Sequence, residues 1–308
     1  MDLIIETDIG RDPDDFFALC YFISAGVNIR AITISPGDEF QIRITRFLLK
    51  ECGLDIPIGV GKLNRTITES GSVHKYFIEK YNFKSKISHD GLGPDVIKET
   101  LKQYPNCDLF VCGPLTSVGR FLKDNGSCGI KYATMQGGFL DYESSEKFYH
   151  GLYEIKKLDK FIGKKTVSTF NLNGDVKGAF AFFETDIYRT FAGKNVCHTV
   201  VYDKHVHEKI MNVPPKDRAA ELLREGMAAR IKDHPEGKMF HDPVAAFCCV
   251  HPSDSGLYIG GHPYRVNGTW GTDVFNEILD HGYKAIRPAR VLTRLDENRF
   301  WDCIAKGI

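Results

Sequence analysis

Five acidic residues crowd into one short stretch near the start of the chain, ETDIGRDPDD, directly after the apolar run MDLII. Carboxylates packed this closely raise one another's pKa unless a cation keeps them ionised. An all-oxygen set of ligands favours Ca²⁺ or Mg²⁺ over zinc. Capping of a helix N-terminus would explain Asp14 or Asp15 alone, but not the whole group. The stretch therefore predicts a local hard-cation site drawn from Glu6, Asp8, Asp12, Asp14 and Asp15.

Two further motifs place polar residues where a helix is expected to begin. In the first, His241 and Asp242 precede a proline and an apolar run, FHDPVAA. This pair can belong to a site, or it can be a helix cap beside a surface histidine. The second motif is CGPLTS, from Cys112 to Ser117, which is also typical of a plain turn with proline at the start of a helix. Taken singly, each motif leaves both interpretations open.

The pattern around these motifs predicts the elements that must position them. Short β-branched runs alternate with amphipathic stretches through the first half of the chain, which indicates βαβ units and a parallel sheet. Ligands of such sheets bind beyond the carboxyl ends of the strands, and Asp8 follows the first predicted strand. The predicted strands cover residues 3–7, 29–35, 55–61 and 107–113, and the predicted helices cover residues 14–26, 40–53, 93–105 and 114–124.

The later part of the chain is less regular. We expect strands at residues 129–138 and 195–203, helices at 214–233 and 239–249, and hairpins between 256 and 275. No internal repeat or Pro/Ser-rich linker divides the sequence. The predicted fold is therefore α/β, an open, mostly parallel sheet flanked by helices, with C-terminal helical and hairpin elaborations, in a single domain over residues 1–308.

Composition excludes several classes of partner. The chain has 308 residues, with 40 basic and 40 acidic side chains, so no net charge favours nucleic acid or an anionic membrane. The nine cysteines include no CxxC pair, which argues against a zinc or redox site and favours reduced thiols. No signal peptide and no apolar run of about 18 residues is present. We expect a soluble cytoplasmic protein.

Taken together, the segments TDIGRDPDDFFAL, GPLTS and HDP resemble the nucleoside hydrolase family, the inosine–uridine-preferring N-ribohydrolases. The motifs of that family are DxDxGxDD before a helix that contains AL, then GPLTN, then HDP. The resemblance implies a mostly parallel α/β fold and one Ca²⁺ at the floor of the pocket. It also implies hydrolysis of a nucleoside to free base and ribose, in nucleoside salvage, by a homodimer or homotetramer.

The resemblance implies a role for each matching residue. Asp8 would be a calcium ligand and the general base for water. Asp15 and Asp242 would complete the carboxylate ligands, and Thr116 would contribute its backbone carbonyl. Asp14 and Asn171 would bind the ribose hydroxyls, and His241 would be the general acid for the leaving base.

The sequence departs from the family pattern at several positions. Glu6 replaces the first Asp, and Arg11-Asp12-Pro13 makes the loop two residues longer. Asp38 stands where an Asn is usual, as another candidate sugar contact, and His89 is a candidate base contact in place of a missing His-Gly. Thr169 stands where the family has a Glu on the 5′ side of the sugar.

Three alternative functions stay open. The loss of that Glu beside Lys164, Lys165, Thr166 and Ser168 would suit a nucleoside 5′-phosphate or a modified nucleoside. A protein that keeps the calcium–ribose pocket only to bind its ligand belongs to a different class. A Mg²⁺-dependent phosphatase is the other enzymatic alternative, and Glu6 at the first acidic position disfavours it.

Overall fold

The structure is a computed structural model that describes residues 1–10, 12–61, 72–84, 88–148, 156–274 and 287–307. Arg11 of the inserted loop lies outside the described residues. The strands are β1 Asp2–Thr7, β2 Asn28–Ile34, β3 Ile58–Val60, β4 Gly91–Leu92, β5 Asp108–Val111, β6 Tyr132–Gln136, β7 Tyr188–Ala192, β8 Val201–Tyr202, β9 Lys238–Met239, β10 Gly256–Val266, β11 Thr269–Asp273 and β12 Ala289–Leu295. The helices are α1 Asp14–Ser24, α2 Glu39–Glu51, α3 Ser72–Lys80, α4 Gly93–Gln103, α5 Thr116–Asn125, α6 Tyr142–Phe148, η2 Lys156–Phe161, α7 Phe170–Gly174, α8 Val176–Phe183, α9 Lys194–Cys197, α10 Lys204–Met211, α11 Arg218–Asp233, α12 His241–Val250 and α13 Glu297–Lys306.

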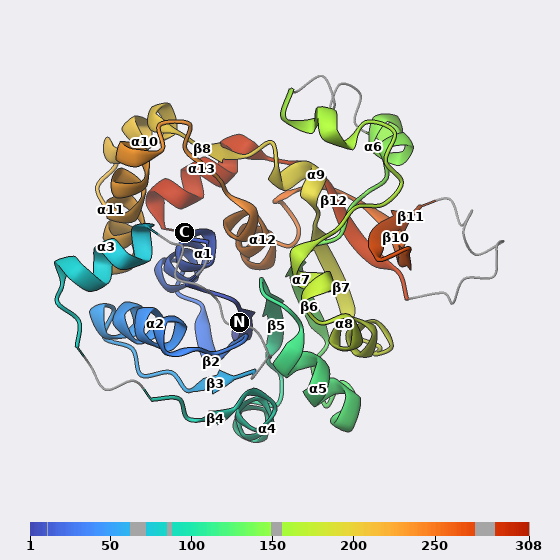
Figure 1. Cartoon of the computed structure of the whole chain (residues 1–308), viewed down its shortest axis with the longest axis horizontal. Coiled ribbons are helices and arrows are strands. Elements are labelled where there is room, and N and C mark those ends of the chain that lie inside the picture. The colour runs from blue at the N-terminus through green and yellow to red at the C-terminus, as the bar shows by residue number, and fades with distance from the viewer. Residues whose placement is uncertain (11, 62–71, 85–87, 149–155, 275–286, 308) are drawn as a thin grey trace.

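The centre of the molecule is a ten-stranded sheet in the order β11-β10-β12-β7-β6-β5-β1-β2-β3-β4 (Figure 1). The strands from β12 to β4 run parallel to one another. At one edge, β10 pairs antiparallel with both β12 and β11. This arrangement confirms the predicted open, mostly parallel α/β sheet. The antiparallel pair β10–β11 also confirms the predicted hairpin for the described part of residues 256–275.

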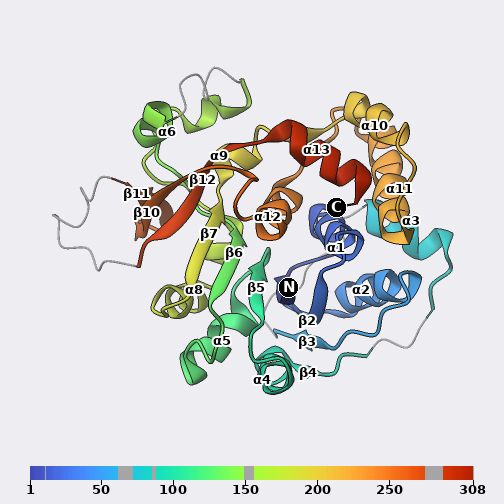
Figure 2. The same cartoon turned by 180° about the vertical axis from the view of Figure 1, so that it is seen from behind.

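Helices cover both faces of the sheet, and each face has its own apolar core. Figures 1 and 2 both place α4, α5 and α8 on one face and α1, α12 and α13 on the other. One core is centred on the fully buried α1, whose Phe16, Phe17 and Phe22 pack with residues of α11 and α12. The other core joins β5 and β6 to α5 and α8, through Phe121 and Phe182 among others. The sheet is thus buried on both sides, as parallel sheets require.

The strand order reverses direction at β1. From β1 the chain continues through β2, β3 and β4 on one side, and it then returns through α4 to β5 on the other side of β1. Such a switch point leaves a crevice at the carboxyl ends of the two strands. Gly113, just after β5, allows their close approach, because a Cβ at this position would lie 2.6 Å from the Asp8 nitrogen.

Glu6 ties β1 to the start of α5. Its carboxylate is fully buried and accepts hydrogen bonds from the backbone N–H of Ser117 at 2.9 Å and of Val118 at 2.6 Å, and from the Ser35 hydroxyl at 2.8 Å. Burial raises its pKa to about 7, against the effect of these donors. Glu6 therefore joins the strand before the acidic stretch to the helix after GPLTS.

Two elements differ from the sequence-based expectation. Residues 195–203, predicted as one strand, form the end of α9 and then the two-residue strand β8, which pairs with β9 outside the main sheet. The strand of the main sheet in this region is β7, which begins seven residues before the predicted strand. The prediction was wrong because NVCHTVVYD is richer in β-branched residues than the sequence YRTFA of β7.

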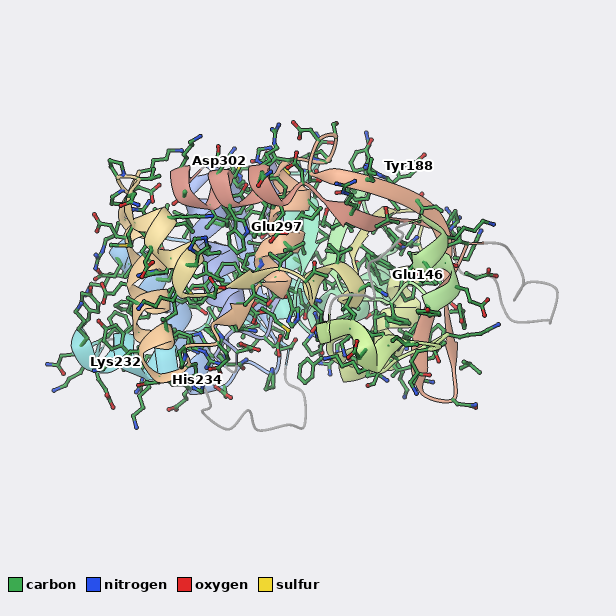
Figure 3. The ribbon with its side chains drawn as sticks, turned by 90° about the horizontal axis from the view of Figure 1, so that it is seen from above. Glu146, Tyr188, Lys232, His234, Glu297 and Asp302 are labelled. Carbon is green, nitrogen blue, oxygen red and sulfur yellow. The ribbon has the colours of Figure 1, made fainter. Side chains whose placement is uncertain are left out.

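The surface carries charged side chains of both signs. Seen from above, the labelled Lys232, Glu297 and Asp302 lie on the outside of helices α11 and α13 (Figure 3). Tyr188, 72% exposed, lies at the start of β7 and stacks on Tyr132 at a ring-centroid distance of 5.7 Å. Among the described helices, none is both long and apolar enough to cross a membrane.

A buried histidine makes the stability of this fold depend on pH. His74 in α3 is fully buried, with the rings of Phe16 and Phe40 edge-on to it, and burial lowers its pKa to about 4. Between pH 6.5 and 4 the unfolded chain therefore binds a proton that the folded chain does not, so stability falls as the pH falls. We expect this residue to cost about 2 kcal/mol of unfolding free energy at pH 5 relative to pH 8.

The measurement is urea unfolding of the wild type and of His74→Phe at both pH values. The variant should lose about 2 kcal/mol less than the wild type on acidification. An equal loss in both proteins would contradict the prediction.

Candidate functional site

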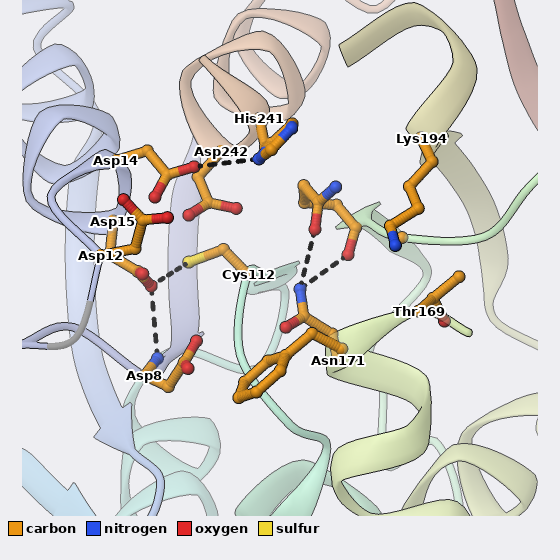
Figure 4. Close-up of a pocket in the computed structure, with 13 residues that line it drawn as sticks. Asp8, Asp12, Asp14, Asp15, Cys112, Thr169, Asn171, Lys194, His241 and Asp242 are labelled. Carbon is orange, nitrogen blue, oxygen red and sulfur yellow. Dashed lines mark hydrogen bonds and ion pairs between the residues drawn. The ribbon is translucent and has the colours of Figure 1, made fainter. Parts of the chain in front are cut away.

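A cavity of about 300 Å³ opens at the switch point, beyond the carboxyl ends of β1 and β5 (Figure 4). The acidic stretch, the residue that follows β5 and the start of α12 meet there. The cavity is lined by Asp8, Asp12, Asp14, Asp15, Cys112, Gln136, Gly137, Thr169, Phe170, Asn171, Lys194, His241 and Asp242.

The first turn of α1 carries Asp14 and Asp15 into the cavity. Both side chains are buried, and Pro13 is the residue before the helix. Asp15 Oδ1 accepts hydrogen bonds from the Asp8 backbone N–H at 3.2 Å and from the hydroxyl of Thr7. These bonds fix the Asp15 carboxylate against the end of β1, beside the backbone of Asp8.

Three side chains form a compact group with the geometry of a metal site. One carboxylate oxygen each of Asp15 and Asp242 and the sulfur of Cys112 all lie within 4.8 Å of one another. Burial and the charge of Asp14 raise the pKa of Asp15 to about 7, and burial and the same charge raise the pKa of Asp242 well above its usual value. A cation among these carboxylates would reverse both shifts. Asp8 lines the same cavity next to this group.

The donor atoms favour a hard cation. The Cys112 thiol donates to Asp15 Oδ1 at 3.3 Å, and burial, followed by the charge of Asp15, raises its pKa well above the usual value. Zinc and other soft metals bind the thiolate, and because carboxylates outnumber the single sulfur of this group, we expect the thiol not to be a ligand. The carboxylates are the oxygen ligands that Ca²⁺ and Mg²⁺ prefer. The residues present thus fit a hard divalent ion.

Asp14 lies between two cationic or hydrogen-bonding groups. The Lys238 amine, 8% exposed, lies 3.4 Å from Asp14 Oδ2, and His241 Nδ1 lies 3.5 Å from the same oxygen. Burial opposes ionisation, but Lys238 and His241 together hold the pKa of Asp14 below its usual range. Lys238 also contacts Asp12 Oδ2 at 3.0 Å, so the inserted loop is joined to the site through this amine.

His241 is the first residue of α12, and its imidazole lines the cavity. With Nδ1 facing Asp14, its Nε2 is buried and has no hydrogen-bond partner among the described residues. Its ring lies 4.9 Å from that of His198, centroid to centroid. The geometry leaves Nε2 available to exchange a proton with a ligand in the cavity.

The opposite wall of the cavity comes from α7 and the loops around it. Asn171 Nδ2 donates to the backbone carbonyl of Gln136 at 2.9 Å and to its side-chain oxygen at 3.0 Å. Thr169 precedes α7 and is buried, and Phe170 is partly exposed in the cavity. Lys194 reaches the cavity from the start of α9, directly after β7.

The structure thus brings together eight of the residues predicted from sequence: Asp8, Asp12, Asp14, Asp15, Thr169, Asn171, His241 and Asp242. Glu6, also predicted for the cation site, is outside the lining and instead binds the start of α5. Thr116 is fully buried at the start of α5 and is outside this lining; its expected contact through the backbone carbonyl stays a prediction. Asp38 caps α2 by accepting from the Gln41 N–H at 3.0 Å, and His89 is exposed on the surface. Neither lines the cavity, and their substrate contacts also stay predictions.

Sequence reasoning missed Lys194, Gln136, Phe170 and Lys238. Lys194 and Gln136 are at the carboxyl ends of β7 and β6, which is the signal that could have found them. Lys194 was missed because β7, the strand that precedes it, was not predicted. Lys238 belongs to no recognisable sequence motif, and its position on β9 places it beside Asp14.

A family model for inosine-uridine preferring nucleoside hydrolases matches residues 3–302. The chain therefore belongs to the inosine-uridine preferring nucleoside hydrolase family, which makes it an N-ribosyl hydrolase by class. A search of curated proteins found no match.

Solved structures of low sequence identity share the fold. A plant nucleoside hydrolase is 17% identical, covering 99% of this chain and 98% of its own, with a TM-score of 0.76. An inosine-guanosine nucleoside hydrolase is 16% identical (100% and 98% covered, TM-score 0.72). An inosine-uridine preferring nucleoside hydrolase from Bacillus anthracis is 15% identical (100% and 99% covered, TM-score 0.72).

The metal site can be tested by thermal unfolding. An ion that binds only the folded chain raises the melting temperature, and saturation at about 100 times Kd is worth about 2.7 kcal/mol, or several degrees for a protein of this size. We expect a divalent cation to produce this shift in the wild type and to lose it in Asp242→Asn. Cys112→Ser should keep the shift, because the thiol is not a ligand. Loss of the shift in Cys112→Ser with retention in Asp242→Asn would contradict the carboxylate site.

Proposed function

We propose that this protein hydrolyses the N-glycosidic bond of a ribonucleoside with one bound Ca²⁺, releasing the free base and the ribose part. The observation that supports it best is the meeting of four buried carboxylates with His241 in one cavity at the switch point of the sheet. Family membership favours this reaction over the Mg²⁺-dependent phosphatase. A pocket used only for binding would need no general base beside the ligand.

The carboxylates divide between holding the ion and acting on the substrate. Asp15 and Asp242, with Asp8 and the Thr116 carbonyl, would hold the calcium ion. When bound, the ion supplies positive charge that keeps these carboxylates ionised and that makes a water in the cavity more acidic. Asp8 is the proposed acceptor of the proton that this water loses as it attacks the anomeric carbon.

The remaining residues act on the sugar and the leaving base. Asp14, which Lys238 and His241 hold in its ionised form, accepts hydrogen bonds from the ribose hydroxyls. Asn171, fixed by Gln136, holds the sugar from the opposite wall. His241 gives a proton from Nε2 to the departing base. The negative charge of the carboxylates stabilises the positive charge that develops on the ribose in the transition state.

Asp8→Asn tests the proposed general base. We expect kcat for base release to fall by about 10²–10⁴-fold, the usual contribution of a general base. The assay is release of free base from a panel of purine and pyrimidine nucleosides and their 5′-phosphates in the presence of calcium.

Asp296→Asn is the matched control, because it makes the same chemical change at the N-cap of α13, where Asn is equally suitable. It should change kcat by less than about twofold, since the residue is outside the cavity. Equal losses in both variants, or full activity in Asp8→Asn, would be incompatible with the proposed mechanism. Turnover by the wild type would also exclude a protein that only binds its ligand.

A further inference from the structure

The end of the cavity away from the carboxylates is cationic. Figure 4 shows Lys194 and Thr169 on the side opposite Asp14 and Asp15, with Asn171 between the two groups. Lys194 Nζ donates one hydrogen bond, at 2.8 Å, to the backbone carbonyl of Ser168. An ammonium group has three N–H donors. No carboxylate pairs with this amine within the described part of the chain, so it has donors to offer a ligand.

Thr169 provides a second donor at the same end. Its side chain is 1% exposed, and its Oγ1 is buried without a hydrogen-bond partner among the described residues. A buried hydroxyl left unpaired is destabilising. Because Thr169 lines the cavity, a ligand oxygen in the cavity can satisfy this group.

The charges around Lys194 favour an anionic ligand. Burial and the neighbouring Lys160 lower the pKa of Lys194. Burial and His241 lower the pKa of the adjacent His198 to about 3, and Lys160 and Lys194 contribute in the same direction. Lys160 and Lys194 therefore repel each other beside a neutral His198, and a ligand with negative charge would offset this repulsion.

We propose that the substrate is a nucleoside 5′-monophosphate, whose phosphate binds Lys194 Nζ and Thr169 Oγ1. This inference rests on the N-glycosidic hydrolysis proposed above and names its substrate class. With the 2′- and 3′-hydroxyls at the carboxylate end, the proposal places the 5′ substituent beyond Asn171, at the end of the cavity formed by Lys194 and Thr169. A phosphate presents oxygens to both the ammonium and the hydroxyl.

The reaction leaves the phosphate ester intact. Water forms the new C–O bond at C1′ as the C1′–N bond breaks. One proton of the water goes to Asp8, the departing base takes a proton from His241, and the hydroxyl remains on C1′. The products are the free base and ribose 5-phosphate, with no oxidant or reductant needed.

The proposed phosphate site is separate from Lys164, Lys165 and Thr166, which suggested a 5′-phosphate in the sequence. Lys164 and Lys165 do not line the cavity, and Thr166 shares a hydrogen bond with Thr269 at 2.7 Å. Lys165 therefore offers a matched control, a lysine of the same region without contact to the cavity.

The kinetic test compares kcat/KM for each ribonucleoside and its 5′-monophosphate, with calcium present. The wild type should prefer the monophosphate by at least tenfold. Lys194→Met should lower this preference by at least tenfold, whereas Lys165→Met should leave it within twofold. A wild type that prefers nucleosides, or equal effects of the two substitutions, would overturn the proposal.

A binding test does not depend on turnover. Calorimetry should show ribose 5-phosphate binding to the wild type at least tenfold more tightly than ribose, with most of this difference lost in Lys194→Met and part of it in Thr169→Val. Equal binding of the two sugars would overturn the phosphate site.

The two proposals fail in different ways. Hydrolysis of nucleosides but not of monophosphates would overturn the substrate class and keep the N-ribosyl hydrolase mechanism. Hydrolysis of neither would overturn the proposed function, and with it the substrate.

Discussion

Mutual repulsion among buried carboxylates at the end of β1 is the constraint on which the rest of this structure depends. Because Asp14, Asp15 and Asp242 share one cavity, the negative charge of one makes ionisation of the others less favourable, and burial adds to this free-energy cost. Lys238 and His241 hold Asp14 in its ionised form, while the group at Asp15 and Asp242 has the arrangement that could hold a metal ion. The carboxylates of the cavity are therefore only partly balanced by the positive charge of the side chains around them.

The fold holds these charged residues close together. The switch point beside β1 supplies the crevice, Gly113 lets the ends of β1 and β5 approach, and Glu6 binds the start of α5 beneath them. Cores on both faces of the sheet keep α1 fixed, and α1 carries two of the carboxylates. The stability of this fold comes from apolar burial. The polar residues of the crevice can therefore interact with a ligand.

Much of the fold and site could be predicted from the sequence, because the relevant signals are local. Strand–helix alternation predicted the parallel sheet, and the acidic stretch, with Asp242, predicted the carboxylates that line the cavity. Lys238 and Lys194 could not be found in this way. Their roles come from tertiary contacts with residues far away in the chain, Lys238 with Asp14 and Lys194 with the segment before α7. A lysine in a short, unrecognised strand or turn looks like a surface residue until the fold is known.

The two ends of the cavity have opposite charge, and this polarity limits what the substrate can be. In the proposed binding mode, a neutral nucleoside would satisfy the carboxylate end through its hydroxyls but would leave the remaining donors of Lys194 unused and the Thr169 hydroxyl without a partner. Buried polar groups without partners reduce affinity for a ligand that cannot satisfy them. The solved structures with this fold are named for different bases, inosine with uridine in one case and inosine with guanosine in another. In the proposed mechanism, the carboxylate end of the cavity acts on the ribose, and the residues that follow β6 and β7 would select the rest of the substrate.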